Sequence, residues 1–157
     1  MILLLLLPFL FSFKLLDVPF VKQEKDFCGP SALSSVLAYY GIHKSQQEIA
    51  KYVYIPALKG ALITDLENYA KSLGLRTELF QGSLENIKEQ IDKGHPVILL
   101  VDLGNAFVSV PHYLVVIGYD ENYFYVHTGY KPREKMSYQE LYRIWSKMGR
   151  VALVVYP

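Results

Sequence analysis

The chain has 157 residues, enough for one domain with its own hydrophobic core. Hydrophobic residues make up 52% and charged residues 20%, which is a globular and not a disordered composition. A net charge of +1 gives no electrostatic footprint for nucleic acid, and a single cysteine excludes an intrachain disulfide.

The first segment, residues 2–13, is apolar except for Ser12 and is followed by Lys14. Because crossing a bilayer takes about 20 residues, this run is too short to span one, and it fits the apolar region of a secretory signal. We therefore expect an exported or membrane-associated protein, in the bacterial periplasm or at the cell surface. Residues 1–15 are expected to form the signal-like or anchor segment and residues 16–157 the folded domain. A buried first strand and a misplaced start are the alternatives.

The next part of the chain predicts helices. Residues 30–40 place apolar side chains on one helical face, and Asp26 is a candidate cap at the start. Pro30 suits the first turn of this helix, and Gly41 suits its end. Three further helix starts carry side chains that can cap the helix: Ser45 with Glu48, Thr64 with Glu67, and Ser83. The helices at Thr64 and Ser83 are expected to close at Gly74 and Gly94.

The following part predicts strands. Continuous apolar runs at 96–103 and 113–119 are typical of buried strands, and a turn at 120–122 leads into a hairpin partner at 123–127. Ser137 with Glu140 predicts a last helix through Trp145, before a final strand at 151–156. The expected fold is one α+β domain, with helices first and a mostly antiparallel sheet after them.

Cys28 stands near the predicted start of the first helix and is followed by Gly29. Unpaired backbone N–H groups and the dipole at a helix start favour a thiolate over a thiol. Gly29 leaves room for a substrate carbonyl beside the backbone. Gln23 lies on the lead-in loop and could donate its side-chain amide to an oxyanion, next to the Cys28 N–H. A buried inert thiol and a solvated glutamine are the structural alternatives.

His112 begins the strand at 113–119 and can face the start of the cysteine helix. His43 and His95 lie in helix-flanking turns, so we expect both at the surface. A cysteine and a histidine from separate halves of the chain match the pattern of cysteine nucleophiles. A strand-edge histidine that caps a hairpin is the alternative. The spacing of the histidines and the cysteine fits no metal site, and no cofactor is expected.

Two segments resemble a known family. Residues 16–33, with Gln23 and the run CGPSAL at 28–33, resemble the nucleophile motif of the bacteriocin-processing, or double-glycine, peptidases. Residues 111–120 resemble their histidine motif. The resemblance is closest to the stand-alone bacterial branch. It implies a papain-like fold, in which an N-terminal helical half carries the cysteine helix and packs on a C-terminal sheet. It also implies Cys28 as nucleophile, His112 as base and Gln23 in the oxyanion hole.

The sequence departs from this family at two positions. The family's glutamine usually stands one residue further from the cysteine than Gln23 does from Cys28. The family also usually has an aspartate where the hairpin returns after the histidine strand, and here Thr128 occupies that place, before Gly129. Thr128 is therefore expected beside the His112 ring, with its hydroxyl accepting a hydrogen bond from it. The competing candidates are a backbone carbonyl, the His127 side chain and Asn105.

These residues together predict a cysteine-type peptidase, a hydrolase that acts on a peptide or protein through a Cys–His thiolate–imidazolium pair. Leader-peptide processing is the form of this activity that the resemblance implies. Two alternatives stay open: a degenerate peptidase that binds peptides without cutting them, and an amidase or acyl transferase on the same fold. No nucleic-acid partner is expected, and residues 2–13 could associate with a membrane.

Overall fold

The structure is a computed structural model that describes residues 13–157. The predicted signal or anchor segment, residues 2–13, therefore lies outside the described residues except for its last position. No helix among residues 13–157 is long and apolar enough to cross a membrane.

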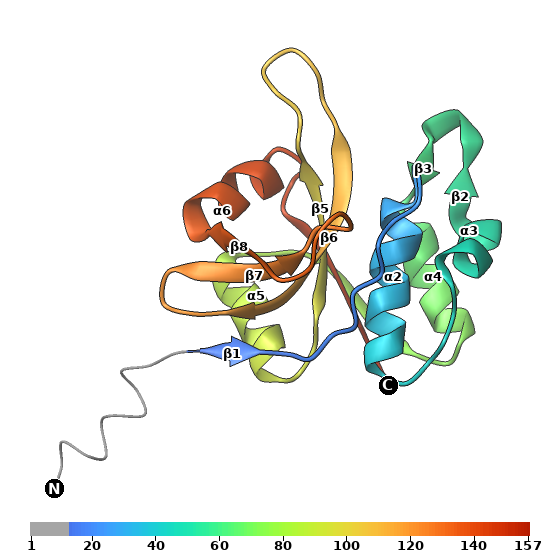
Figure 1. Cartoon of the computed structure of the whole chain (residues 1–157), viewed down its shortest axis with the longest axis horizontal. Coiled ribbons are helices and arrows are strands. Elements are labelled where there is room, and N and C mark those ends of the chain that lie inside the picture. Colours follow the sequence, from blue (N-terminus) through green and yellow to red (C-terminus); the bar gives the residue numbers. More distant parts are fainter. Residues whose placement is uncertain (1–12) are drawn as a thin grey trace, which may run out of the picture.

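The N-terminal half is helical, as the sequence predicts. Its helices are α2 (Cys28–Tyr39), α3 (Gln46–Val53) and α4 (Ile63–Ser72). A small hairpin of β2 (Tyr54–Ile55) and β3 (Gly60–Ala61) joins α3 to α4 through the 3-10 turn η1 (Pro56–Leu58). Figure 1 shows these elements grouped on one side of the central strands.

The other half is built around an antiparallel sheet of seven strands with the path β4-β9-β5-β6-β7-β8, and β1 pairs with β6 off this path. The strands are β1 (Lys14–Leu15), β4 (Arg76–Gln81), β5 (Val97–Asp102), β6 (Pro111–Tyr119), β7 (Tyr123–His127), β8 (Glu134–Ser137) and β9 (Val151–Tyr156). The helices α5 (Leu84–Asp92) and α6 (Tyr138–Ser146) lie on the side of β5 and β6 away from α2, as Figure 1 shows.

The core lies on both faces of β5 and β6, which explains their continuous apolar runs. Strand β6 is buried from His112 to Tyr119, and β5 is buried except at Leu100. Helix α2 packs against β6, so the start of α2 meets the start of the histidine strand. The predicted α+β arrangement, with a helical half on a mostly antiparallel sheet, is confirmed.

The predicted helix caps are confirmed in three places. Ser45 and Glu48 form a capping box at α3, and the hydroxyls of Ser83 and Ser137 accept backbone N–H groups at α5 and α6. At α5 the second half of the box is Asn86, whose side chain accepts the Ser83 N–H.

Two predicted caps are wrong. Helix α2 begins at Cys28 with Phe27 as its N-cap, and no side chain caps it, because Asp26 adopts a left-handed backbone with φ of 63°. Helix α4 begins at Ile63 after Leu62, again without a side-chain cap. Glu67 is engaged elsewhere, since its carboxylate accepts the Thr77 hydroxyl at 2.7 Å.

The sequence analysis predicts none of the strands β1, β2, β3, β4 and β8. Strand β4 carries mostly polar residues because it is an edge strand, paired along its whole length with β9 only. Strand β1 pairs with β6 at Gly118, where a Cβ atom would come within 2.4 Å of the Lys14 carbonyl oxygen. Only glycine permits this close approach, and the signal is invisible without the partner strand.

The loop between β5 and β6 leads directly into the candidate site. Buried Asp102 holds it, because its carboxylate accepts the N–H groups of Gly104 and Val110 and the hydroxyl of Ser109. The Val110 N–H, the largest of these effects, lowers the pKa of Asp102 below its usual range. This network fixes Val110 and Pro111, the residues just before His112.

Candidate active site

Cys28 is the first residue of α2 and is half-buried. Gly29 allows this position, because a Cβ atom there would lie 3.2 Å from the Tyr113 ring and 3.4 Å from the Ala61 Cβ. The glycine thus lets the helix start pack closely on β6 and on β3. Close packing is thus a role of Gly29 that the sequence analysis does not predict; it expects only room for a substrate carbonyl beside the backbone.

The protonation of the Cys28 thiol is governed by opposing effects. Burial raises the pKa of Cys28 and is the largest effect. Hydrogen bonds from the backbone N–H groups of Tyr113, Gly29 and Cys28 itself act in the opposite direction, and the nearby charge of Asp26 adds to the increase in pKa. Gly29, the residue after Cys28, packs on the Tyr113 ring, so Cys28 lies close to the residue that follows His112. In the free protein the net effect favours the thiol over the thiolate.

His112 is the second residue of β6 and is only 4% exposed. Its Nε2 lies 2.6 Å from the backbone carbonyl oxygen of Thr128. Since a carbonyl only accepts, Nε2 carries the proton and Nδ1 is the basic nitrogen. Burial lowers the pKa of His112, and the hydrogen bond to Thr128 partly opposes this effect. The ring is therefore held neutral and in one tautomer.

Thr128 contacts the His112 ring, but through a different atom from the one predicted. The hydroxyl of Thr128 faces its own turn, where it accepts the N–H groups of Tyr130 and Lys131. The partner of His112 is the Thr128 carbonyl, which is the backbone alternative considered from the sequence.

The other candidates for orienting His112 are engaged elsewhere. The Nε2 of His127 donates to the Val18 carbonyl at 2.7 Å, and its Nδ1 accepts the Arg133 N–H. Asn105 accepts the N–H groups of Phe107 and Val108 within its own loop.

Tyr130 is a site residue that the sequence analysis missed. Its ring stacks on the His112 ring with centroids 5.4 Å apart and an interplanar angle of 10°. Tyr130 is 57% exposed, so it covers the imidazole from the solvent side and shields the hydrogen bond to Thr128. No pattern within a single strand or helix marks it, because it lies in the irregular turn after β7.

Gln23 is fixed against the same turn. Its N–H donates to the Gly129 carbonyl at 2.8 Å, and its side-chain Oε1 is buried with no hydrogen-bond partner. Oε1 packs so closely on Gly129 that a Cβ atom there would lie 2.3 Å away, and the φ of Gly129 is +87°. The side-chain NH₂ is the end of the amide left to donate, and Gln23 lines a pocket together with Cys28 and His112.

Two pockets meet at Cys28, and both are also lined by Lys59 and Pro111. The polar pocket, of about 430 Å³, is lined by the candidate site residues Gln23 and His112 and also by Tyr130, Glu24, Lys25 and Asp26. The apolar pocket, of about 480 Å³, is lined chiefly by Leu58, Leu62, Ile63, Leu100, Tyr113 and Met148. The candidate site is therefore a cleft with Cys28 between a polar and an apolar half.

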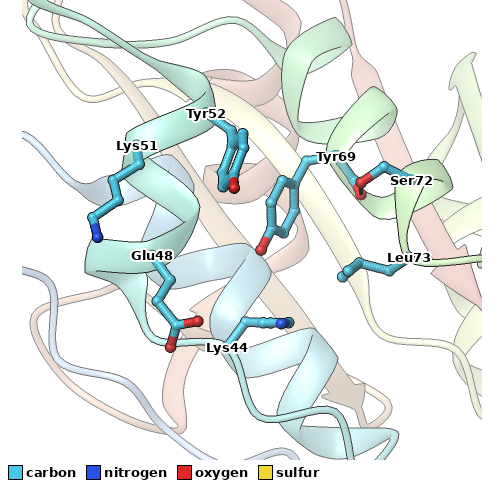
Figure 2. A pocket seen from close by; sticks show the side chains of 7 residues that line it. All are labelled: Lys44, Glu48, Lys51, Tyr52, Tyr69, Ser72 and Leu73. Carbon is cyan, nitrogen blue, oxygen red and sulfur yellow. Dashed lines mark hydrogen bonds between the residues drawn. The ribbon is translucent and has the colours of Figure 1, made fainter.

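A third pocket lies between α3 and α4, away from Cys28. Figure 2 shows Tyr52 and Tyr69 facing each other there, with Lys44, Lys51 and Glu48 around them. Its volume is about 320 Å³, but it contains neither Cys28 nor a histidine.

The remaining histidines lie apart from the cleft. His43 is exposed as expected, but His95 is half-buried, since its ring stacks on Tyr156 with centroids 4.7 Å apart. Within residues 13–157 no cluster of three or more His, Cys, Asp or Glu side chains could hold a metal ion.

Solved structures place this fold in the class of papain-like peptidase domains. A C39-like peptidase from Bacillus anthracis superposes with a TM-score of 0.77 at 19% identity, covering 93% of this chain and 98% of that one. The peptidase domain of Streptococcus ComA, an ABC transporter involved in quorum sensing, gives 0.74 at 23% identity, covering 92% and 98%.

A double-glycine-motif protease from an AMS/PCAT transporter, solved with its leader peptide, gives a TM-score of 0.75 at 21% identity, covering 92% and 94%. At these identities the likeness establishes the fold.

The family follows from the sequence match. Residues 15–153 match the family model described as the Peptidase_C39 like family, and the chain belongs to this family. The resemblance to the bacteriocin-processing peptidases is thereby confirmed, and family membership supports a peptidase function. A comparison with curated proteins found no significant match.

Proposed function

We propose that the protein is a cysteine peptidase in which Cys28 is the nucleophile and His112 the base. One observation carries the proposal: the Nε2 of His112 is fixed on the Thr128 carbonyl, so its basic nitrogen is free in the pocket that Cys28 also lines. The peptide bound to the related AMS/PCAT protease supports a peptide substrate. Leader-peptide processing, which the family resemblance implies, is one form of this activity.

The proposed reaction is acyl transfer to water. The sulfur of Cys28 attacks the amide carbon, and the oxyanion is held by the Cys28 N–H and the side-chain NH₂ of Gln23. His112 takes the thiol proton and gives it to the amine as the C–N bond breaks. Water then attacks the thioester, His112 takes its proton, and the C–S bond breaks to release the acid and return the thiol.

The charge state of the pair determines when Cys28 becomes reactive. Burial raises the pKa of Cys28 and lowers the pKa of His112, so each charge alone is disfavoured in the free protein. A thiolate and an imidazolium formed together compensate each other's loss of hydration, with the N–H groups of α2 and Tyr113 as further support for the thiolate. The reactive ion pair therefore depends on His112 staying in place.

Iodoacetamide alkylation and turnover test this assignment. Cys28 is expected to react in the native protein, and His112→Ala should shift this reactivity to higher pH, because burial raises the pKa of Cys28 and the thiolate then lacks its imidazolium partner. Cys28→Ala and His112→Ala should each abolish cleavage of a peptide library while the thermal unfolding stays cooperative. His95→Ala, at a half-buried histidine outside the cleft, is the control and should retain turnover.

Two results would contradict the proposal. One is wild-type turnover in either active-site variant. The other is a thiol that stays inert until denaturant is added. A wild-type protein that binds library peptides but cuts none would instead fit a degenerate binding module, and an amine adduct in place of an acid product would indicate acyl transfer.

We also propose that residues 2–13 direct export or membrane association, on the basis of their apolar sequence. Cell fractionation of the full chain and of a chain lacking these residues tests this. Equal amounts of both chains in the soluble cytoplasmic fraction would overturn it.

A further inference from the structure

Exposed apolar side chains gather on the loop between β5 and β6. Phe107 is 94% exposed, and three further residues of this loop are exposed as well: Leu103 (43%), Val108 (57%) and Val110 (46%). Residues 103–111 contain no charged side chain. Leaving several large apolar side chains in water is unfavourable, and a contiguous apolar patch of this kind marks a surface that meets a partner.

The loop is held in one shape by hydrogen bonds of its own. The side chains of Asp102 and Asn105 accept most of its backbone N–H groups, and two backbone bonds close it. The N–H groups that donate in this way are those of Leu103, Gly104, Asn105, Phe107, Val108 and Val110. A backbone N–H that enters lipid has to find its acceptor within the protein, so this internal bonding suits insertion into a bilayer surface.

A second apolar tip lies at the same end of the molecule. It is the turn η1 between β2 and β3, where Leu58 is 58% exposed and Pro56 and Ala57 are exposed too. Figure 1 shows this turn and the β5–β6 loop projecting at the same end, one from each half of the fold. The cleft lies between the two tips, because Leu58, Cys28 and Pro111, the residue after the loop, line one pocket.

The shape and charge of the two tips favour a lipid surface as their partner. Two separate projections fit a deformable bilayer better than a stable protein interface, which buries about 800 Å² on each partner. Lys59 follows Leu58, and Lys147 precedes Met148, which lines the pocket between the tips; both lysines are exposed. Apolar tips with lysines at their base match a bilayer that contains anionic lipids.

We propose that the β5–β6 loop and the turn η1 insert together into the surface of an anionic bilayer and place the mouth of the cleft at the membrane. Lys14 pairs with Tyr119, at the other end of β6 from the loop, so this contact is separate from one through residues 2–13. It is also independent of the proposed peptidase function.

Tryptophan fluorescence of the full chain tests the proposal. The single tryptophan, Trp145, is fully buried, so the wild-type chain gives the background. In Phe107→Trp, vesicles of phosphatidylcholine and phosphatidylglycerol should shift the emission to shorter wavelength, and bromine-labelled acyl chains should quench it. Tyr123→Trp is the matched control, because Tyr123 is also exposed but lies at the other end of β6. Its emission should not change.

Second substitutions in the Phe107→Trp chain show whether the tips insert. Val108→Asp in the loop and Leu58→Asp in the turn η1 each place a charge on an apolar tip. Each should raise the vesicle concentration for half-maximal quenching at least about tenfold. Tyr123→Asp, which places the same charge at the other end of β6, should leave this concentration unchanged.

The lysines are tested by the lipid composition. Lys59→Gln and Lys147→Gln should each raise the vesicle concentration for half-maximal quenching by about fivefold when phosphatidylglycerol is present. Neither should have an effect on vesicles of phosphatidylcholine alone. Equal effects on both kinds of vesicle would contradict the role of anionic lipid.

Three results would overturn bilayer insertion by the tips. One is an emission of Phe107→Trp that vesicles leave unchanged. Another is equal quenching in Tyr123→Trp, which would mean adsorption without a preferred face. The third is quenching that Val108→Asp does not weaken, which would assign membrane contact to residues 2–13 alone.

A protein partner would give a different pattern. A shift of the Phe107→Trp emission by substrate peptides in the Cys28→Ala background, with none by vesicles, would assign the tips to peptide binding and overturn the proposal. None of these measurements depends on turnover, so they stand even if the protein cuts no peptide.

Discussion

Gly129 connects the two side chains that surround Cys28 in the proposed mechanism. The carbonyl of the preceding residue, Thr128, holds His112, and the Gly129 Cα packs on the Gln23 amide. Gly129 has a left-handed backbone with a φ of +87°, and this conformation lets one turn form both contacts. Any side chain at this position has to displace Gln23.

Gly129→Ala should therefore lower kcat/KM by about 100-fold, comparable to removing one oxyanion donor. The built Cβ atom lies 2.3 Å from the Gln23 Oε1, so the amide cannot keep its place. Peptide cleavage and urea unfolding, measured together, separate the loss of activity from the loss of stability.

Gly74→Ala is the matched control, because its φ is +84° and no atom lies within 4 Å of a built Cβ. In both variants the strain of alanine in a left-handed backbone should lower the free energy of unfolding by about 1 kcal/mol. Only Gly129→Ala should lose activity. The two losses should not add when Gly129→Ala is combined with Gln23→Ala. Additive losses would show that the turn acts through another group.

The Thr128 carbonyl takes the place of the aspartate that the family usually has beside its histidine. A backbone carbonyl accepts a hydrogen bond from His112 without a charge, and the Thr128 hydroxyl keeps that carbonyl in place by closing the turn. The Tyr130 ring stacks on one face of the His112 ring. The geometry therefore orients the His112 ring through a neutral backbone partner in place of a carboxylate.

The starts of helices α3 and α4 show that the same sequence pattern gives different local structures. Ser45 and Thr64 each precede a glutamate at the spacing of a capping box, but only Ser45 caps its helix. Helix α4 starts two residues earlier than the pattern predicts, at Ile63 after the N-cap Leu62, and Ile63 lines the apolar pocket.

Ser45→Ala should lower the free energy of unfolding by about 1 kcal/mol, because it leaves the Glu48 N–H without its acceptor. Thr64→Ala should change it by less than about 0.5 kcal/mol, since the threonine is exposed and caps nothing. Urea unfolding of the two single variants measures the difference directly. Equal losses would mean that the Thr64 pattern stabilises α4 after all.

The side chain of His127 forms a hydrogen bond with Val18, a residue 109 positions earlier in the chain. It donates to Val18 in the lead-in segment and accepts from Arg133 at the end of the turn that carries Thr128 and Gly129. The lead-in carries Gln23, so one buried imidazole holds both segments that frame the polar pocket. A proton on Nδ1 would oppose the Arg133 N–H.

Stability should therefore depend on the neutral form of His127. Burial, the largest effect, lowers the pKa of His127, so the unfolded chain binds a proton at pH values where the folded chain does not. The free energy of unfolding should fall as the pH drops below about 6.5, by at most about 1.4 kcal/mol per pH unit for this group. Urea unfolding between about pH 5 and 8 measures the slope.

His127→Asn should lower stability at neutral pH and flatten this slope, with the burial of His112 and His95 accounting for the remainder. Val18→Ala is the control, because it loosens the same contact region without removing a titrating group. It should lower stability and leave the slope unchanged. An unaltered slope in His127→Asn would assign the acid sensitivity to other groups.

The sequence alone determined the elements whose signals are local. Apolar runs located β5, β6 and β9, serine caps located α3, α5 and α6, and the motif around Cys28 placed the cysteine near a helix start. These signals depend on hydrogen bonds and burial within a few residues of each other. The family resemblance is confirmed over residues 15–153, and the pairing of Cys28 with a histidine on a distant strand stays a prediction.

The surroundings of Cys28 and His112 follow from tertiary contacts that the sequence does not reveal. Every residue has a carbonyl, so nothing in the sequence singles out the one of Thr128 as the partner of His112, nor marks Tyr130 as the ring that covers it. The apolar pocket is assembled from separate segments around Leu62, Leu100 and Met148, each unremarkable in its own part of the chain. Strand β4 is recognisable as a strand only through its pairing with β9, because it lies at the edge of the sheet and its sequence is mostly polar. Contacts between distant segments arise from packing, and no local periodicity encodes them.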